Sequence, residues 1–345
     1  MQPIRICRRF LAVVFALQAC VASVSCTATP NAPSDAKAAA DTSRSPECTS
    51  LLGTPLYALP LSPKKLGERL ELLLLAEAEF ARAPALTATA EAAAIWVGRQ
   101  LAYLGRYRDA IAFYTRSLSS SQFPSSYRLL RHRGHRYLTL RAFSLAEADL
   151  TTAWSLASSC ADAIEADGLP TPGVPPRSTD HGNILYHLAL AKYLGGDFSG
   201  AASTLSLALD CATNDDSRVS CAYWLYLSAS RAGASASDSA LATRALASVR
   251  TVAEGGMDVR ENATYWNLCL VFKGVLDPST LTAADGSLGI GVDKATLEYG
   301  LSMHDLLRGD TSAARARWKR VVTETDWPAF GHIAAEADLA RARGS

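Results

Sequence analysis

Basic side chains are concentrated in one short segment of this 345-residue chain. Residues 127–141 (YRLLRHRGHRYLTLR) contain five arginines and two histidines and no aspartate or glutamate. Arginine binds carboxylates and phosphates through paired hydrogen bonds, so the segment predicts a binding site for an anionic group. The alternative is a solvated helix face whose arginines pair with Glu147, Asp149 or neighbouring helices.

Three histidines, His132, His135 and His187, are the candidate metal ligands, since a zinc site needs such a cluster with a carboxylate or water to complete it. Arginines on or beside the same helix face would repel a cation, and we therefore expect neither a metal nor a cofactor. No nucleophile–base pair or carboxylate pair recurs at chemical spacing, so we expect no catalytic residues and no enzymatic activity.

Helices must position these side chains, because the chain is rich in alanine and short polar residues. Residues 95–118 (IWVGRQLAYLGRYRDAIAFYTRSL) closely resemble the tetratricopeptide repeat, a helix–turn–helix unit of about 34 residues. In this unit Gly98 permits close helix approach, residues 104–107 form the turn, and Ala110 and Tyr114 face inward. The resemblance implies an all-α fold, an α-solenoid.

The unit recurs along the chain, in residues 132–153, 186–208, 222–247, 263–274 and 296–322. The fourth copy is weaker, and the fifth has a degenerate second helix that starts near residues 277–278. The turn positions are Gly105, Arg141, Gly196, Gly233, Gly274 and Gly309. Their intervals are close to one repeat, except between the second and third. Residues 165–180 (EADGLPTPGVPPRSTD) account for most of that excess and predict a surface loop, because proline interrupts helices.

Both ends of the repeat domain, residues 61–345, predict helices. Ser62 is a good N-cap with Pro63 after it, leading a helix to about Ala83. Residues 327–343 predict a final helix whose polar face closes the stack. We expect a solenoid without a sheet over residues 60–343.

The resemblance also implies that the first helices of the units line a concave groove that binds an extended peptide or a partner helix. By register, the groove candidates are Trp96, Arg99, Arg128, Arg131, His132, His135, Asn183, Tyr186, His187, Tyr223, Trp224, Tyr265, Tyr299 and Met303. An anionic anchor flanked by aromatics suits a peptide C-terminus, an acidic segment, or an acidic polysaccharide or lipid head. Packing between repeats is the alternative role of Tyr186, Tyr223 and Trp224.

The N-terminal residues are typical of export. A basic start and a short apolar run predict a signal peptide over residues 1–20. Residues 17–20 (LQAC) resemble a bacterial lipobox, which implies lipidation of Cys20, and Val21 in place of aspartate implies the outer membrane. The alternative is simple cleavage and secretion. Residues 21–60 predict a flexible tether. Cys211 and Cys221 flank a turn and permit a local disulfide in an oxidising compartment.

Composition limits the function further. A net charge of +1 argues against a nucleic-acid binder. We expect a non-enzymatic scaffold that binds a protein or peptide, possibly an acidic one, and is attached to the membrane of the cell envelope by an N-terminal lipid. The alternative is a carbohydrate- or nutrient-binding surface lipoprotein, and a metal-dependent enzyme is disfavoured.

Overall fold

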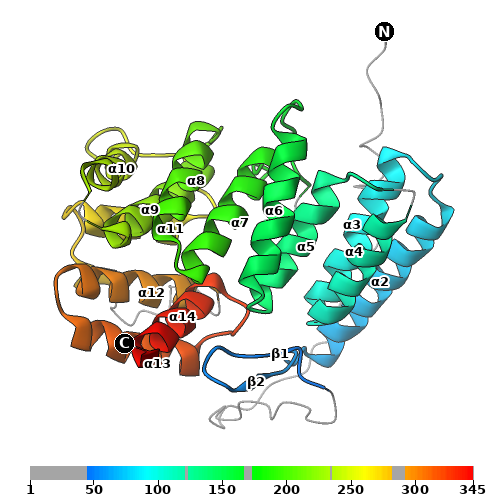
Figure 1. The fold of residues 1–345 in the computed structure, drawn as a ribbon, viewed down its shortest axis with the longest axis horizontal. Helices are drawn as coiled ribbons and strands as arrows, with labels where there is room; N and C mark the ends of the chain where they lie inside the picture. The colour runs from blue at the N-terminus through cyan, green and yellow to red at the C-terminus, as the bar shows by residue number, and fades with distance from the viewer. Residues whose placement is uncertain (1–44, 121–122, 167–172, 234, 282–291, 345) are drawn as a thin grey trace, which may run out of the picture. The chain divides into compact units, whose positions relative to one another are not determined.

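The computed structural model describes residues 45–120, 123–166, 173–233, 235–281 and 292–344. The chain divides into two units, Met1–Ala39 and Ala40–Ser345, and every described residue belongs to the second (Figure 1). The predicted signal peptide, Cys20 and most of the predicted tether therefore lie outside the described residues. Within the described residues, no helix combines the length and apolar character required to cross a bilayer.

The described part of the chain is built from α-helices with one short hairpin. The elements, in chain order, are β1 (Cys48–Thr49), β2 (Pro55–Leu56), α2 (Pro63–Arg82), α3 (Ala88–Tyr103), α4 (Tyr107–Ser119), α5 (Tyr127–Thr139), α6 (Phe143–Ala157), α7 (Asp180–Gly195), α8 (Phe198–Asp210), α9 (Asp215–Ala232), α10 (Ala236–Ala247), α11 (Ala263–Phe272), the 3₁₀ turn η1 (Pro278–Leu281), α12 (Val292–Leu307), α13 (Thr311–Glu324) and α14 (Phe330–Gly344).

Consecutive helices pack against each other in antiparallel pairs, α3 with α4, α5 with α6, α7 with α8, α9 with α10 and α12 with α13. Each pair corresponds to one predicted repeat, and η1 replaces the second helix of the degenerate unit, as predicted. Helix α2 has Ser62 as its N-cap, whose side chain accepts a hydrogen bond from the backbone N–H of Lys65, and Ala83 as its C-cap. The prediction of an all-α solenoid is confirmed.

All six predicted turn positions have a positive φ where the first helix of a pair ends. Their φ angles run from 65° at Arg141 to 139° at Gly233. Glycine adopts this conformation without strain, whereas an arginine pays about 1 kcal/mol for it. The contacts of Arg141, described below, explain why this cost is tolerated.

Small residues allow the helices of a pair to approach closely. A Cβ atom added at Gly98 would lie 2.1 Å from the ring of Tyr114 on the facing helix. Ala110, Ala146 and Ala201 are fully buried at the equivalent crossings of successive pairs. The buried apolar residues form one cluster between the first helices, from Leu73 to Leu129, a larger one from Leu138 to Leu339, and a small third one around Ile184, each between stacked helices.

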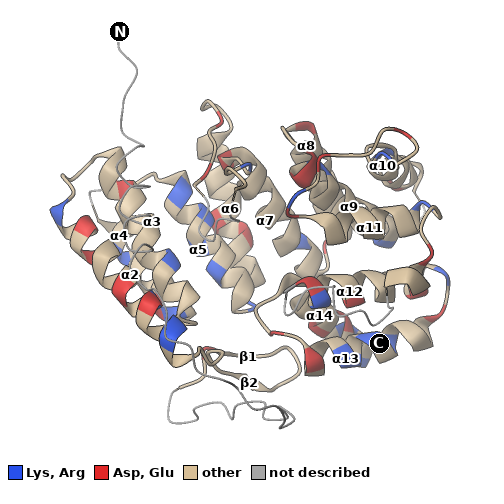
Figure 2. Ribbon diagram, turned by 180° about the vertical axis from the view of Figure 1, so that it is seen from behind, with Lys and Arg blue, Asp and Glu red and all other residues tan. Residues whose placement is uncertain are grey.

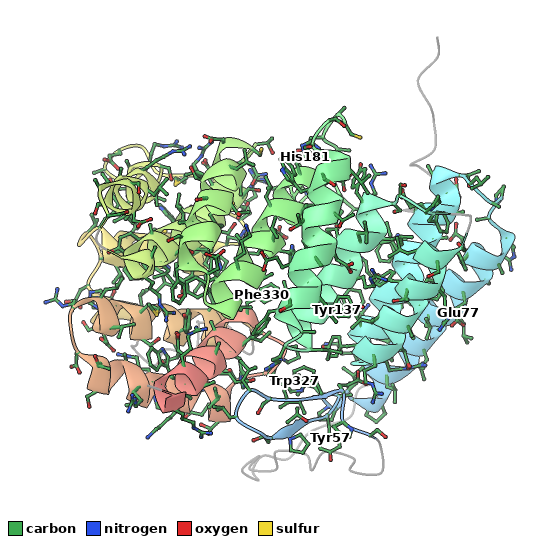
Figure 3. All side chains as sticks on the ribbon, in the orientation of Figure 1. Tyr57, Glu77, Tyr137, His181, Trp327 and Phe330 are labelled. Carbon is green, nitrogen blue, oxygen red and sulfur yellow. The ribbon has the colours of Figure 1, made fainter. Side chains whose placement is uncertain are left out.

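The segment before α2 differs from the prediction of a tether up to residue 60. Residues 48–56 form an antiparallel hairpin in which Cys48 pairs with Leu56. The backbone N–H of Leu51 donates to Glu336 on α14 at 2.6 Å, and the indole N–H of Trp327 donates to the carbonyl of Tyr57 at 2.7 Å (Figure 3). These contacts with the C-terminal part of the chain hold the segment in place, so the tether ends earlier than predicted.

The last helix, α14, also differs from its predicted role as a polar cap. It packs against α12, α13 and α7, and its carboxylates Glu336 and Asp338 are buried (Figure 1). Glu336 pairs with Arg141 at 2.6 Å, and Asp338 pairs with Arg231 at 2.7 Å. The acidic residues of α14 thus compensate buried arginines of earlier repeats instead of facing solvent.

Candidate functional site

Three of the four arginines of α5, namely Arg128, Arg131 and Arg133, have carboxylate partners within the fold, whereas Arg136 lies over the ring of Tyr107. Arg128 contacts Asp180 at 2.8 Å and Glu91 at 3.1 Å. Arg133 makes two 2.7 Å hydrogen bonds to Asp149, which is the internal pairing that the sequence left open. Figure 2 shows basic positions on α5 with acidic positions on nearby elements. Most of the local positive charge is therefore neutralised.

Glu165 is the carboxylate partner of two further groove candidates, Arg99 and Arg131. It belongs to the strap, which we define as residues 163–166 at the start of the predicted surface loop. Its carboxylate contacts Arg99 and lies 3.3 Å from Nε of Arg131. It also accepts a hydrogen bond from the side-chain amide of Asn183 at 2.9 Å. The strap thus brings together three of the predicted groove residues.

His132 lies in the same cluster as a neutral imidazole. Its Nδ1 atom is 3.0 Å from Nη1 of Arg131, and its ring stacks on Tyr114. Because a guanidinium only donates, Nδ1 accepts and the ring proton is on Nε2, which faces Glu165 at 3.6 Å. Burial, with the charges of Arg131 and Arg99, holds the pKa of His132 well below 6.5.

His135 and His187 meet in the middle of the predicted groove. Their ring centroids are 4.4 Å apart, and Phe330 of α14 lies 5.4 Å from the first and 5.7 Å from the second. Nδ1 of His187 bonds the carbonyl of Asn183 at 2.6 Å. Among the described residues, no group of three or more His, Cys, Asp or Glu side chains is placed to hold a metal ion. Phe330, labelled in Figure 3, thus brings the start of α14 against both histidine rings.

Three aromatics and one methionine predicted to line the groove are buried in the core instead. Tyr223 and Trp224 are 0% and 1% exposed, and Tyr299 and Met303 are also fully buried. Packing between repeats, the alternative role, is therefore the correct one for Tyr223 and Trp224. The reason is that α9 packs against α8, α10 and α11, so only its first turns reach the groove and the side chains of Tyr223 and Trp224 lie between helices.

A polar pocket remains open at the N-terminal ends of α7, α9, α11 and α12. We call it the groove pocket; its volume is about 340 Å³. Its floor includes Tyr186 and Tyr265, whose hydroxyls are 3.1 Å apart. The buried indole of Trp224 donates to the Tyr186 hydroxyl at 3.0 Å and fixes this pair. Burial raises the pKa of both tyrosines, so the floor is uncharged.

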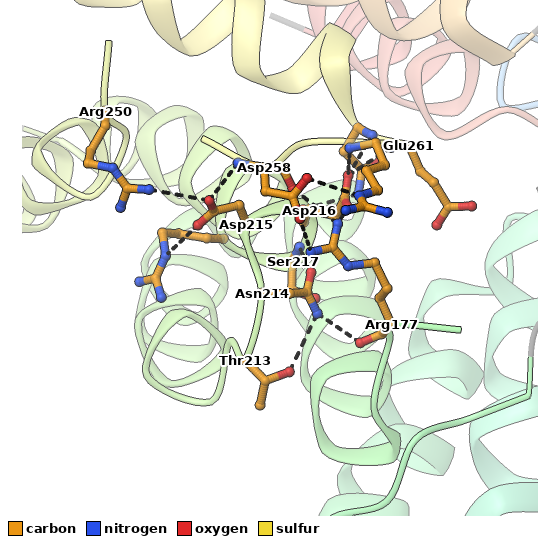
Figure 4. Close-up of polar contacts among 12 residues, drawn as sticks. Arg177, Thr213, Asn214, Asp215, Asp216, Ser217, Arg250, Asp258 and Glu261 are labelled. Atoms are coloured by element: carbon orange, nitrogen blue, oxygen red, sulfur yellow. Dashed lines mark hydrogen bonds and ion pairs between the residues drawn. The ribbon is translucent and has the colours of Figure 1, made fainter. Parts of the chain in front are cut away.

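Charged residues on the rim give the groove pocket an acidic character. Asp216, Glu261 and Asp293 line it, against the single lining arginine, Arg177. Arg177 is itself paired with Asp216 at 2.5 Å and with Asp258 at 3.0 Å (Figure 4). Sequence reasoning missed these rim residues, because they lie at helix starts and in loops outside the repeat pattern.

The rim is rigidly held, as Figure 4 shows. One oxygen of Asp216, a residue only 4% exposed, accepts hydrogen bonds from the backbone N–H groups of Arg260, Glu261 and Asn262 at 2.8–3.0 Å. The side chain of Asn262 donates back to the carbonyl of Asp216 at 3.0 Å. The loop before α11 is thereby fixed against the start of α9.

A second pocket, the strap pocket, has a volume of about 210 Å³ and lies between α3, α5 and the strap. Four predicted groove residues line it, namely Trp96, Arg99, Arg128 and His132. The guanidinium of Arg99 lies over the ring of Trp96 at 5.3 Å. These four residues share one surface, and the strap, which the sequence did not predict there, covers part of it.

Nucleophilic chemistry has little support in the described residues. Burial raises the pKa of Cys221 to about 12, so this thiol stays protonated, and it is free, as is Cys211. Thr325 contacts Nδ1 of His332 at 3.1 Å, and Nε2 of His332 lies 3.7 Å from Glu336. The Thr325 hydroxyl donates to the carbonyl of Val321, so the imidazole acts as the donor and does not activate the hydroxyl.

Comparison with known proteins gives a structural neighbour but no sequence relative. No family model matches the chain, and the search of curated proteins found no match. A solved tetratricopeptide repeat protein from Parabacteroides merdae is similar in structure, at 14% sequence identity and a TM-score of 0.44. The match covers 80% of this chain and 93% of the neighbour. The repeat architecture itself is established by the helix pairs and turns of this chain.

Proposed function

We propose that the protein is a non-enzymatic interaction scaffold that binds a segment of a partner protein in the groove pocket. The observation that carries the proposal is this pocket between the first helices of successive repeats, with an uncharged tyrosine floor and a fixed rim. Helical repeats present extended concave surfaces of this kind to partners. Phe330 covers the middle of the groove, so binding is restricted to the pocket.

The charge of the rim selects the partner. With Arg177 and Asp216 compensating each other, Asp293 adds a further negative charge to the lining. A lysine or arginine on the partner segment fits this potential and can lie against the ring of Tyr186 or Tyr265. The acidic partner that the sequence suggested does not suit this pocket.

The test is site-specific crosslinking in the producing cell. Thr264, which lines the pocket, is replaced by the photoreactive residue p-benzoylphenylalanine, and exposed Ser239 on α10 serves as the control position. We expect a defined crosslinked partner from position 264 only. Asp293→Lys should weaken this crosslink about tenfold, whereas Glu77→Lys on the exposed face of α2 should not. Equal crosslinking at both positions, or no effect of Asp293→Lys, refutes the proposal.

The location is proposed on the sequence alone. A lipid on Cys20, with the residues after it as a tether, would hold the domain at the cell envelope. Mass spectrometry of the mature N-terminus and membrane fractionation of a Cys20→Ala variant test this. An unlipidated mature protein in the culture medium would favour secretion instead.

A small polar ligand such as a saccharide is the second candidate. The groove pocket is at the lower end of the ~300–1,000 Å³ range of small-molecule sites, and tyrosine rings with hydroxyls suit sugars. Calorimetry with a panel of oligosaccharides distinguishes the two functions, because only the saccharide function predicts binding that Tyr265→Ala removes.

A further inference from the structure

One carboxylate, that of Glu165, is held by side chains from three helices. Arg99 on α3, Arg131 and His132 on α5 and Asn183 on α7 all direct nitrogen atoms at it. These helices are the first helices of three consecutive repeats, and the carboxylate side chain is only 11% exposed. The donors therefore form a built site for a carboxylate on the wall of the groove.

The positive charge of this site exceeds what Glu165 supplies. Arg99 and Arg131 are two guanidinium groups facing one carboxylate, and His132 is neutral. Arg131 is 7% exposed, and its Nε atom has no hydrogen-bond partner of good geometry, although the Glu165 oxygen is 3.3 Å away. A buried N–H that lacks a well-aligned acceptor costs free energy, so the site favours a better-placed anionic acceptor.

The strap that carries Glu165 is held by few backbone bonds. Ile164 forms an isolated bridge with Thr179, and the backbone N–H of Glu165 donates to the carbonyl of Ser178 at 2.9 Å. The side chain of Ile164 is 57% exposed and contributes little to the core. Besides the contacts of the Glu165 carboxylate, moving the strap would break two more hydrogen bonds, from Nη1 of Arg99 to the carbonyl of Ala166 at 2.6 Å and from the backbone N–H of Asp180 to the carbonyl of Ala163 at 2.9 Å.

The strap also separates the two pockets. Residues 164–166 line the strap pocket, while Asn183, which holds Glu165, lines the groove pocket. The bond between Glu165 and Asn183 therefore lies where the linings of the two pockets meet, so a segment that takes the place of Glu165 contacts both linings.

We propose that Glu165 occupies, within its own chain, a binding site for a carboxylate of the partner segment, and that the partner displaces it to reach Arg99 and Arg131. This inference deepens the proposed function, because it gives the same partner segment an acidic residue beside the basic one. Glu165 acts as a tethered competitor, so only a segment with a correctly placed carboxylate occupies both pockets.

The test uses the purified full chain and two fluorescein-labelled peptides, an Ala-Glu repeat and its Ala-Gln counterpart, with binding followed by fluorescence anisotropy. Glu165→Gln keeps the shape of the competitor and removes its charge, and we expect it to bind the acidic peptide about tenfold more tightly than the wild type. Glu77→Gln is the matched control, an exposed charge on α2 that should leave the affinity unchanged. Adding Arg131→Gln to Glu165→Gln should abolish the gain.

The inference is overturned if folded Glu165→Gln binds the acidic peptide no more tightly than the wild type, or if it gains equally for the glutamine peptide. If circular dichroism shows that Glu165→Gln does not fold, Glu165→Asp serves as the test. This variant, whose competing carboxylate is on a shorter side chain, should bind the acidic peptide more tightly than the wild type does. Equal or weaker binding overturns the inference. The crosslink from position 264 is independent of this result. If the peptide test fails and a partner is still crosslinked from position 264, the inference is wrong and the proposed function stands.

Discussion

Replacing Arg141 with glycine sets two opposing effects against each other at one residue. The left-handed backbone of Arg141, with φ of 65°, is relieved by glycine. The guanidinium, however, donates to both carboxylate oxygens of Glu336, at 3.2 and 2.6 Å, and to the carbonyl groups of Thr139 and Trp327. The side chains of this ion pair are 2% and 1% exposed.

The loss is expected to exceed the gain. Removing one partner of a buried ion pair costs about 3–5 kcal/mol, while the relieved backbone strain returns about 1 kcal/mol. We therefore expect Arg141→Gly to lower the free energy of unfolding by about 2–4 kcal/mol. Urea denaturation at neutral pH, followed by far-ultraviolet circular dichroism, measures this difference.

A double-mutant cycle isolates the ion pair from the backbone effect. Glu336→Gln added to Arg141→Gly should cost at least ~1 kcal/mol less than the sum of the single changes, because the first change already leaves the carboxylate unpaired. Arg308→Ala, at an exposed arginine beside the turn at Gly309, is the control and should change stability by less than about 0.5 kcal/mol. An unchanged or raised stability of Arg141→Gly would refute the reasoning.

Three further predictions follow from burial. Gly98→Ala should lower the free energy of unfolding by about 1–3 kcal/mol in thermal denaturation, because its Cβ would meet a tyrosine ring at 2.1 Å; an unchanged melting temperature would contradict this. Burial lowers the pKa of His135 and His187 well below 6.5, so the unfolded chain protonates first. Stability should be full above that pH and fall below it by up to about 1.4 kcal/mol per pH unit for each histidine, and a urea midpoint that does not fall on acidification would be inconsistent. Iodoacetamide should label exposed Cys160 in the native protein and should not label Cys221, because burial raises the pKa of this thiol to about 12. Mass spectrometry of digests identifies the labelled cysteine.

The local rules of the repeat were readable from the sequence. A turn needs a left-handed residue and a crossing needs a small one, so Gly105, Gly98 and Ala110 sit at fixed offsets. Arg141 was recognised as a turn residue by its position alone, although its type argues against that conformation. Capping at Ser62 follows equally simple chemistry.

Contacts between distant segments leave no comparable pattern in the amino-acid sequence. Nothing in the neighbourhood of Glu165 indicates that it pairs with Arg99 on α3, nor does the sequence around Glu336 indicate Arg141. The burial of Trp224 was one of two alternatives that the sequence left open, because α9 has apolar residues around its circumference and its sequence does not mark an outer face. The candidate site could thus be located by repeat register, whereas its occupant and its charge balance required the structure.

The carboxylate of Glu336 has a consequence for how the chain folds. It joins the hairpin at Leu51, the turn of an early repeat at Arg141 and the last helix, contacts that span up to 285 residues of sequence. Stacked repeats usually fold and fray from their ends, since each unit contacts only its neighbours. Here the two ends of the described domain close on each other, so the last helix must be synthesised before the first hairpin can dock. Folding should therefore be slow and cooperative, as expected of high contact order. While the chain is still being synthesised and α14 is incomplete, the hairpin cannot yet dock.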